Sequence, residues 1–529
     1  MRPISANWPD AARRQFAVVE ENATGGNIRP AAVQVQFLRN ILLRVPTYRE
    51  HLDRITTPAT LVAEPLTRFL RLPSPSSEPA PLDGQTNFST QHSASIPAAK
   101  VSWIGALMRD DQSPPEISWA DDKAVHLASG ALLALHAGGG QLPPASIAPN
   151  DLNYDFKMDF AIATGSGLKI YRQQDAQHFR DITVESKIPA AIAQASYTGA
   201  WAFDVDLDGD LDLVLGSPKG ETVVLRNNGD GTFAPIHPFH EVDGLTAFTA
   251  ADLDGDGDPD VALVDGGGKL AVFVNERLGQ YRRRDIPANL SQGIRAISAA
   301  DINGDGTLDL VLLKSDSSVV RLSQKEDSSD WESTELLRAA SSDSANLFLA
   351  DMYNNSALDI VVNGQVFLSD GKSFVPLPAK LAALPHAVAD LNSDGRLDIL
   401  GMDQNNAPVE LINHGGQNYH WQVIRTRAAH ATGDQRMNSF GLGGEIEIRS
   451  ELLAQKQIIS SPILHFGLGQ HPAAQFARIV WPNGFVQAEF DLKSDQTVLA
   501  EQRIKGSCPM LFTWDGHEMQ FVKDVGPWG

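Results

Sequence analysis

The chain has 529 residues, of which 42% are hydrophobic and 20% charged, and its 65 acidic against 43 basic residues give a formal net charge of −22. An acidic surface of this kind repels nucleic acid phosphates and anionic lipid, so neither is expected as a partner. The single cysteine, Cys508, excludes an intramolecular disulfide and a thiolate metal cluster, and no apolar run approaches the length of about 18 residues that spans a membrane.

The first 98 residues differ in composition from the rest of the chain. Residues 1–72 are predicted to be a helical segment, because apolar residues recur at helical spacing between Pro30 and Pro46, and a second short helix is expected around residues 61–70. Residues 73–98 are rich in Pro, Ser, Ala and Gln and are predicted to be a linker. The start of the chain carries no apolar signal-peptide core, so we expect any export signal to lie outside this sequence.

Residues 99–415 contain a repeat of short β-type runs separated by Gly and Asp turns. Each unit opens with an Asp-rich nonapeptide, and the six copies begin at Asp151, Asp204, Asp252, Asp301, Asp351 and Asp390. A spacing of about 50 residues suits one four-stranded propeller blade per repeat. The apolar runs at 125–128 and 131–135 suit one further blade without the motif. The region is therefore predicted to be an all-β propeller, with seven blades expected.

The nonapeptides have the ligand pattern of a calcium loop. Oxygen-bearing side chains stand at positions 1, 3, 5 and 9, and Gly at position 6 allows the sharp turn that brings them together. Calcium takes hard oxygen ligands in flexible geometry, whereas magnesium requires a tight octahedron, so about four or five Ca²⁺ sites are expected. Position 7 would contribute its backbone carbonyl. The candidate residues are Asp204, Asp206, Asp208, Asp210 and Asp212 in the second copy; Asp252, Asp254, Asp256, Asp258 and Asp260 in the third; Asp301, Asn303, Asp305, Thr307 and Asp309 in the fourth; Asp390, Asn392, Asp394, Arg396 and Asp398 in the sixth; and Asp151, Asn153, Asp155 and Asp159 in the first.

Two copies depart from this pattern. The first has Phe156 in place of the glycine, so weak or absent metal binding is expected there. The fifth retains Asp351 and Asp359 but has lost two ligand positions, which predicts a structural turn without metal. An EF-hand is excluded, because that loop needs a bidentate Glu at position 12 and helices on both sides.

Residues 416–505 are predicted to form a small β-sandwich. The segments 445–448 and 478–481 alternate as strands do, and 482–484 reads as a turn. Residues 506–529 begin another strand–turn–strand pattern, which predicts the start of a further β segment. Truncation of that segment is one interpretation of the pattern.

Two parts of the chain resemble known families. The nonapeptide-plus-strand units resemble FG-GAP/VCBS repeats, which implies an integrin-like propeller with structural calcium at its rim loops. The segments Asn418–Val423, Gly443–Ile448, Leu464–Gly469 and Ile479–Gly484 resemble the ASPIC/UnbV domain that commonly follows such propellers in cartilage acidic protein and many bacterial relatives. The Gly-Ala-Arg that usually opens this domain is replaced here by Gly443-Gly444-Glu445, so that turn is expected to differ.

The sequence contains no recognisable catalytic constellation. His465 stands between apolar residues and is predicted to pack in a core, and Ser439 and His414 lack the elbow or order of a catalytic triad. We therefore expect a non-catalytic calcium-binding protein of the cell surface, extracellular space or periplasm that mediates adhesion to a protein or polysaccharide. Two alternatives stay open, because a fold does not fix a function: a glycosidase or lyase built on the propeller, and a subunit of a surface assembly or filament.

Overall fold

The computed structural model describes residues 8, 10–25, 31, 34–35, 38, 79–82, 86–92, 96, 101–110, 112–136, 142–324, 330–342, 344–428, 437–451, 453–503, 510–514 and 519–524. By its internal contacts the chain divides into two compact units, residues 1–72 with 254–256 and 325–329, and all remaining residues. Each unit is described by itself.

The first unit contains helix α2 (Asp10–Thr24). Its Ala12 is buried in a small cluster with Trp8 and Leu38. Four positions of the helical run predicted after Pro30 are helical, at 31, 34, 35 and 38; the rest of that run and the helix predicted around residues 61–70 lie outside the described residues. Within the described part of the chain, no helix is long and apolar enough to cross a membrane.

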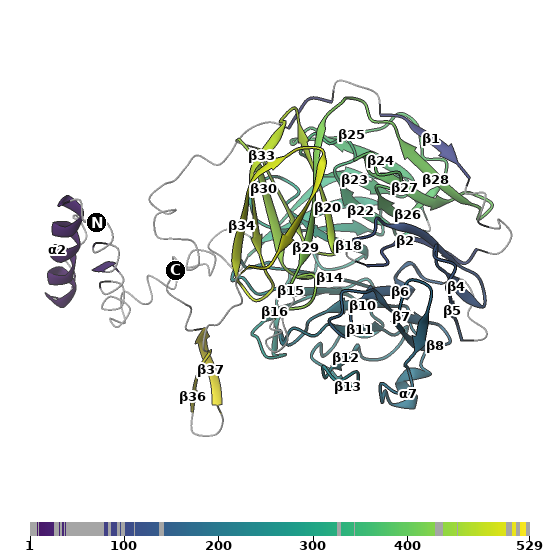
Figure 1. Cartoon of the computed structure of the whole chain (residues 1–529), viewed down its shortest axis with the longest axis horizontal. Helices are drawn as coiled ribbons and strands as arrows, with labels where there is room; N and C mark the ends of the chain where they lie inside the picture. The colour runs from purple at the N-terminus through teal and green to yellow at the C-terminus, as the bar shows by residue number, and fades with distance from the viewer. Residues whose placement is uncertain are drawn as a thin grey trace. The chain divides into compact units, whose positions relative to one another are not determined.

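The second unit contains the predicted propeller. Six four-stranded antiparallel sheets and one half of an eight-stranded sheet make up seven blades (Figure 1). The first strands of neighbouring blades lie side by side. Strand β6 (Ile147–Asn150) lies against β10 (Gly199–Phe203), β14 (Ala247–Ala251) against β18 (Ile294–Ala300), β18 against β22 (Leu347–Ala350), and β26 (Leu384–Ala389) against β2 (Trp103–Leu107). These strands therefore surround a common axis. Because the last blade adjoins the first, the sheets close into a ring, and the seven-bladed prediction is confirmed.

Each blade runs outward from the axis in chain order. The strands are β2 (Trp103–Leu107), β3 (Glu116–Ala120), β4 (Ala124–His126) and β5 (Leu132–Ala134); β6 (Ile147–Asn150), β7 (Asp159–Thr164), β8 (Gly167–Gln173) and β9 (Phe179–Asp181); β10 (Gly199–Phe203), β11 (Asp212–Gly216), β12 (Val223–Asn227) and β13 (Phe233–Ile236); β14 (Ala247–Ala251), β15 (Asp260–Val264), β16 (Leu270–Asn275) and β17 (Tyr281–Arg284); β18 (Ile294–Ala300), β19 (Asp309–Lys314), β20 (Ser318–Gln324) and β21 (Trp331–Arg338); β22 (Leu347–Ala350), β23 (Asp359–Val362), β24 (Gln365–Ser369) and β25 (Phe374–Pro376); and β26 (Leu384–Ala389), β27 (Asp398–Met402) and β28 (Pro408–Asn413). Two short helical turns, η1 (Pro144–Ser146) and α7 (Ala190–Ala193), lie between blades in the sequence.

The seventh blade takes its outermost strand from far upstream. Strand β1 (Phe88–Gln91) pairs antiparallel with β28, with Phe88 opposite Asn413. Nearby, the Ala80 N–H donates to the Asn355 carbonyl oxygen at 3.0 Å, and Leu82 packs on the core between the last two blades. Part of segment 73–98, which the sequence predicts to be a linker, therefore belongs to the propeller. The sequence does not reveal this strand, because its pairing partner lies more than 300 residues away and leaves no local signal.

The strands that follow the Asp-rich loops are buried on both faces. Leu213, Val214 and Leu215 of β11 have no exposed surface, and β15, β23 and β27 are likewise buried throughout. Alternate residues of a strand point to opposite faces, and each face here meets a neighbouring blade. The propeller core is therefore a ring of apolar clusters between blades, which explains why these runs are continuously apolar and do not alternate.

The C-terminal domain consists of two sheets, as predicted. One contains β31 (Leu453–Ile458), β30 (Glu445–Ser450), β33 (Ala473–Val480) and β34 (Val486–Lys493), and the other contains β32 (Ile463–Gly469), β29 (His420–Arg427) and β35 (Gln496–Glu501). Ile446 and Ile479 of the first sheet share a buried cluster with Ile424 and Phe466 of the second. Strand β31 also joins the propeller, because Gln457 pairs with Ala300 of β18. Downstream, β36 (Met510–Trp514) and β37 (Met519–Asp524) form an antiparallel pair.

Candidate metal sites on one face of the propeller

The six Asp-rich loops lie on one face of the propeller. Each loop joins the first strand of a blade to its second strand, for example β10 to β11 around residues 204–212. The first strands surround the axis in the same sense, so all first-to-second connections emerge on the same side. The structure thus brings together candidate residues that are spread over about 250 positions of sequence, 151 to 398.

The aspartate at position 1 shapes each loop through its own carboxylate. In the second loop, the Asp204 carboxylate accepts the N–H groups of Asp208 at 3.1 Å and Gly209 at 3.0 Å. The same pair of bonds, from positions 5 and 6, reaches Asp151, Asp301, Asp351 and Asp390. These aspartates therefore build the turn as well as offering oxygen atoms to a cation.

The aspartate at position 9 ties its loop to the blade. Asp212 accepts the N–H of Val205 at 2.9 Å through one oxygen and the N–H of Asn227, at the end of β12, at 2.8 Å through the other. Asp159, Asp260, Asp359 and Asp398 accept the equivalent two N–H groups. The sequence patterns assigned this position to the metal alone and did not show its bonds to the third strand of the blade.

A residue outside the predicted set completes this arrangement. The Asn227 side-chain amide donates to the Leu152 and Leu211 carbonyl oxygens at 3.0 and 3.3 Å, which links two neighbouring loops. Asn413 does the same for Met352 and Leu397, and Asn275 donates to Pro259. A polar residue closes the second apolar run of these repeats in the sequence, and that recurrence was the available signal for them.

The second loop has the geometry of a cation site. Asp204, Asp206 and Asp208 each place one carboxylate oxygen within 4.8 Å of the other two. The Asp206 Oδ1 atom is buried and accepts no hydrogen bond from any residue that the structure describes. A guanidinium nitrogen of Arg226 is 4.0 Å from the other Asp206 oxygen. The buried carboxylate oxygens fit a cation that takes oxygen ligands, because such a cation supplies the charge that their surroundings lack.

The raised pKa values of the aspartates in the second loop also favour a cation there. Burial, followed by repulsion from Asp208 and Asp206, raises the pKa of Asp204 well above its usual value. Burial and the Asp208 charge raise the pKa of Asp206 to about 6, and the same two causes raise the pKa of Asp210 to about 6. Without a cation, ionising these groups destabilises the folded loop.

The fourth and sixth loops share the raised aspartate pKa values of the second loop, but an asparagine, Asn303 or Asn392, stands at position 3 in place of an aspartate. Burial and the neighbouring Asp305 charge raise the pKa of Asp301 to about 7, and burial raises the pKa of Asp398 to about 6. Asn303 and Asn392, at position 3, donate to the position-5 aspartates at 2.7 and 3.3 Å. Both side chains therefore lie beside the position-5 aspartates of their own loops.

Side chains at position 7 turn toward other partners. Asp258 of the third loop forms a two-bond pair with Arg277, with Nε–Oδ2 at 2.5 Å and Nη2–Oδ1 at 2.6 Å. Thr307 donates its hydroxyl to Asp305, and Arg396 lies 3.6 Å from Asp394. The backbone carbonyl therefore remains the predicted ligand at position 7. Residues 254–256 of the third loop belong to the first unit.

The first and fifth loops contact the C-terminal domain. The Ser439 hydroxyl donates to Asp151 Oδ2 at 2.6 Å, and the Gln455 amide donates to Asp351 Oδ2 at 3.3 Å. Phe156 and Ser356, which replace glycine at position 6, keep the left-handed conformation with φ of 63° and 73°. The substitution therefore leaves the turn itself unchanged, and the backbone strain is offset by contacts that these side chains make.

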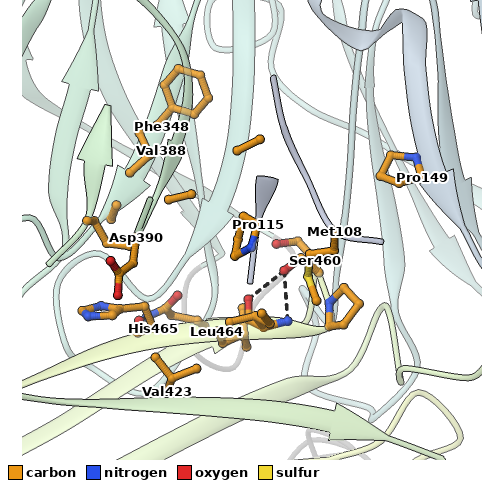
Figure 2. Close-up of a pocket in the computed structure, with 18 of the residues that line it drawn as sticks. Met108, Pro115, Pro149, Phe348, Val388, Asp390, Val423, Ser460, Leu464 and His465 are labelled. Carbon is orange, nitrogen blue, oxygen red and sulfur yellow. Dashed lines mark hydrogen bonds between the residues drawn. The ribbon is translucent and has the colours of Figure 1, made fainter. Parts of the chain in front are cut away.

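A cavity of about 450 Å³ lies between the first strands of the blades and the C-terminal domain. Its walls include Met108, Phe348, Val388 and Leu464, and Asp390 lies beside His465 on one side (Figure 2). The His465 ring is buried and bonds the Gly395 carbonyl oxygen through Nε2 at 3.1 Å. Burial lowers the pKa of His465 to about 4, so the ring is neutral at physiological pH, in keeping with the packed histidine that the sequence predicts.

Two family models match the chain. The FG-GAP-like repeat matches residues 151–215, 204–263 and 252–312, and the ASPIC and UnbV family matches residues 457–506. No curated protein sequence matches the chain. Both matches agree with the arrangement of a propeller followed by a β-sandwich.

Several solved structures are similar to part of this chain. A lectin from Agrocybe aegerita that recognises non-reducing terminal N-acetylglucosamine is 18% identical, over 61% of this chain and 93% of its own, with a TM-score of 0.38. The BP39L lectin from Burkholderia pseudomallei is 14% identical, over 63% and 97%, with a TM-score of 0.39. The Dos1 propeller is 11% identical, over 59% and 76%, with a TM-score of 0.40.

Proposed function

We propose that this chain, a propeller of FG-GAP-like repeats followed by an ASPIC and UnbV domain, is a calcium-binding, non-catalytic protein that binds a protein or glycan outside the cytoplasm. The observation that carries the proposal is the second loop, where three carboxylates converge within 4.8 Å and a buried oxygen of Asp206 accepts no hydrogen bond from the described part of the chain. The second, third, fourth and sixth loops are the proposed sites.

In the second loop, Asp204, Asp206 and Asp208 would hold the ion with side-chain oxygens, and Asp210 with its backbone carbonyl. Asp212 already accepts two N–H groups, but each carboxylate oxygen has a further lone pair for a cation. Bound calcium would supply positive charge and a cross-link between the two ends of the loop. Because the ion binds only the folded loop, it stabilises the folded state by mass action.

The distribution of perturbed carboxylates supports a binding role over a catalytic one. Twelve carboxyl groups with a raised pKa lie in the first, second, fourth, fifth and sixth loops. General acids and bases are usually found among such groups. Here their position in the turns ties them to the loops, and the cavity at the axis is lined mostly by apolar residues.

The proposed calcium sites support the proposed location outside the cytoplasm. Loops of this kind would be filled at the millimolar calcium levels of extracellular space, where weak sites of about 10⁻⁴–10⁻³ M are in use. The strongly acidic charge of −22 favours partners that are neither nucleic acid nor anionic lipid. A protein or glycan surface is the remaining class of large partner, and a propeller offers it a broad face of turns.

Calorimetric titration with calcium tests the proposal directly. We expect several binding equivalents in the wild-type chain, fewer in a variant carrying Asp206→Asn and Asp208→Asn, and no loss with Asp122→Asn, which changes an exposed aspartate in the turn between β3 and β4. Melting temperature should rise in calcium and fall in EDTA. A chain that binds no calcium, or melts identically in both, would rule out the proposed sites. A glycan array probed with and without calcium then separates glycan from protein partners.

A further inference from the structure

The residue at position 6 of the Asp-rich loops has a second role in the structure. In five of the six loops this residue meets the C-terminal domain, whether it is a glycine or not. The five residues and their partners are Phe156 with Phe440 and Arg427, Gly257 with Gly484, Gly306 with Lys456, Ser356 with Gly467, and Gly395 with His465 and Trp421. The C-terminal domain therefore covers the loop face of the propeller by touching the tips of the loops.

The first and fifth loops hold the domain by direct contacts. Phe156 packs edge-on against Phe440, with ring centroids 6.1 Å apart, and its ring lies 4.2 Å from the Arg427 guanidinium. The buried Ser439 hydroxyl donates to Asp151 at 2.6 Å. These loops lack the full ligand pattern, and the side chains that depart from the pattern are the ones that reach the domain.

The fifth loop is bound even more closely. The Ser356 hydroxyl donates to the Gly467 carbonyl oxygen at 2.6 Å, and the Gly469 N–H donates to the Asn354 carbonyl oxygen at 2.8 Å. A side chain at Gly467 would collide with Asp351, so β32 lies directly on the loop. Together with the Gln455 amide, these groups satisfy polar atoms of the loop that are buried from water.

The fourth and sixth loops keep the full ligand pattern and use the backbone. The Gly306 carbonyl oxygen accepts a bond from Lys456 Nζ at 3.2 Å, and the Gly395 carbonyl oxygen accepts one from His465 Nε2 at 3.1 Å. A side chain at Gly395 would collide with the Trp421 indole, so glycine is needed there for the contact as well as for its φ of +80°. Position 7, the next residue, is the one that offers its carbonyl to the cation.

We propose that calcium and the C-terminal domain are linked ligands of this face of the propeller. The first and fifth loops hold the domain without metal, whereas calcium in the fourth and sixth loops fixes the turn that presents the position-6 carbonyl to Lys456 and His465. Calcium then tightens docking, and docking raises calcium affinity by the same factor, because coupling between two binding events is reciprocal. This inference rests on the calcium sites proposed above.

The second loop provides a matched control. Gly209 donates its N–H to Asp204 inside its own loop, and among the described residues no hydrogen bond joins Gly209 to the C-terminal domain. Calcium there should stabilise its blade with little effect on docking. Asp305 and Asp394, at position 5 of the fourth and sixth loops, bond only within their loops in the contacts described, so replacing them removes cation ligands and leaves the docking contacts in place.

The test is hydrogen exchange of residues 453–469 in the full chain, with and without calcium, alongside calorimetry on the same samples. In the wild type, we expect calcium to slow exchange of these residues by about tenfold, within the usual range of about 5- to 150-fold for coupled sites. Asp305→Asn with Asp394→Asn should abolish this slowing. Asp206→Asn with Asp208→Asn should preserve it, although both double variants lose calcium equivalents by calorimetry.

The outcomes separate the two proposals. If the wild type binds no calcium, the proposed calcium sites are refuted. Calcium binding without any slowing of exchange, or slowing lost equally in both double variants, would refute the linkage and leave the sites intact. The reciprocal measurement is calcium affinity in Lys456→Met, which should fall by about the same factor, with Lys493→Met, an exposed lysine at the end of β34, unchanged. Equal affinity in the two lysine variants would contradict the linkage.

Discussion

Replacing Asp206 with Asn should have opposite effects on stability with and without calcium. Burial, followed by the Asp208 charge, raises the pKa of Asp206 from 3.8 to about 6. At about 1.4 kcal/mol per pKa unit, this difference corresponds to about 3 kcal/mol. The side chain is 16% exposed, and solvent screening reduces the cost of the ionised group to about 1–2 kcal/mol. A neutral amide removes this cost in the metal-free protein and removes a ligand in the calcium-bound protein.

The sign of the pH dependence follows from linkage. The folded-state pKa of Asp206 is raised, so the folded state holds the proton more tightly than the unfolded chain. The contribution of this group to stability is fully present below the unfolded pKa, about 3.9, and is lost as the pH rises through about 6. The advantage of Asp206→Asn in metal-free buffer should therefore be small at pH 4 and complete at pH 7.5.

Thermal unfolding followed by circular dichroism measures both effects. At pH 7.5, Asp206→Asn should melt above the wild type in metal-free buffer and below it in calcium, while Asp122→Asn follows the wild type in both. The reasoning is refuted if Asp206→Asn melts below the wild type without metal at pH 7.5. An advantage of equal size at pH 4 would show that something other than carboxylate ionisation is responsible.

Three further outcomes are expected. Asn227→Ala leaves two loop carbonyl oxygens without their donor and should cost about 1–3 kcal/mol in calcium and EDTA alike; a loss seen only in calcium would contradict a purely structural role. In Gly395→Ala the new methyl group would collide with Trp421, so this variant should melt at a lower temperature and its C-terminal domain should become open to proteolysis. Gly304→Ala is the control, because Gly304 also has a positive φ but open space around it. This variant should lose stability without loosening the C-terminal domain. A chain that starts at residue 73 retains β1 and should keep a melting temperature near the wild type; one that starts after β1 exposes the edge of β28 and should melt lower.

Much of the fold follows from local spacing. An Asp-rich turn followed by an apolar run, repeated about every 50 residues, predicts one blade per repeat, and the structure contains the seven blades that the sequence predicts. The loops are also local objects, because the aspartate at position 1 bonds the N–H groups of positions 5 and 6 of the same loop. Each loop is built from residues within one repeat, and the regular spacing of the copies predicts the blades.

Three features depend on residues far apart in the chain. The sequence of β1 has no strong strand pattern of its own. This strand is stabilised by pairing with β28, which lies far away in the chain. The carboxylate of Asp212 reaches the N–H of Asn227, so its structural role depends on the third strand of the blade. Phe156 and Ser356 look like defects of a calcium loop in the sequence, but in the structure they contact Phe440 and Gly467 of the C-terminal domain.

The sequence by itself determined the repeat, the all-β class, the loops and the residues that can surround a cation, because spacing within a short segment fixes which side chains converge. Only the tertiary structure decided which face carries the loops, how the ring closes, and that the C-terminal domain rests on the position-6 residues. Those contacts join surfaces from separate parts of the chain, and their free energy comes from burying apolar and polar groups against one another after each part has formed.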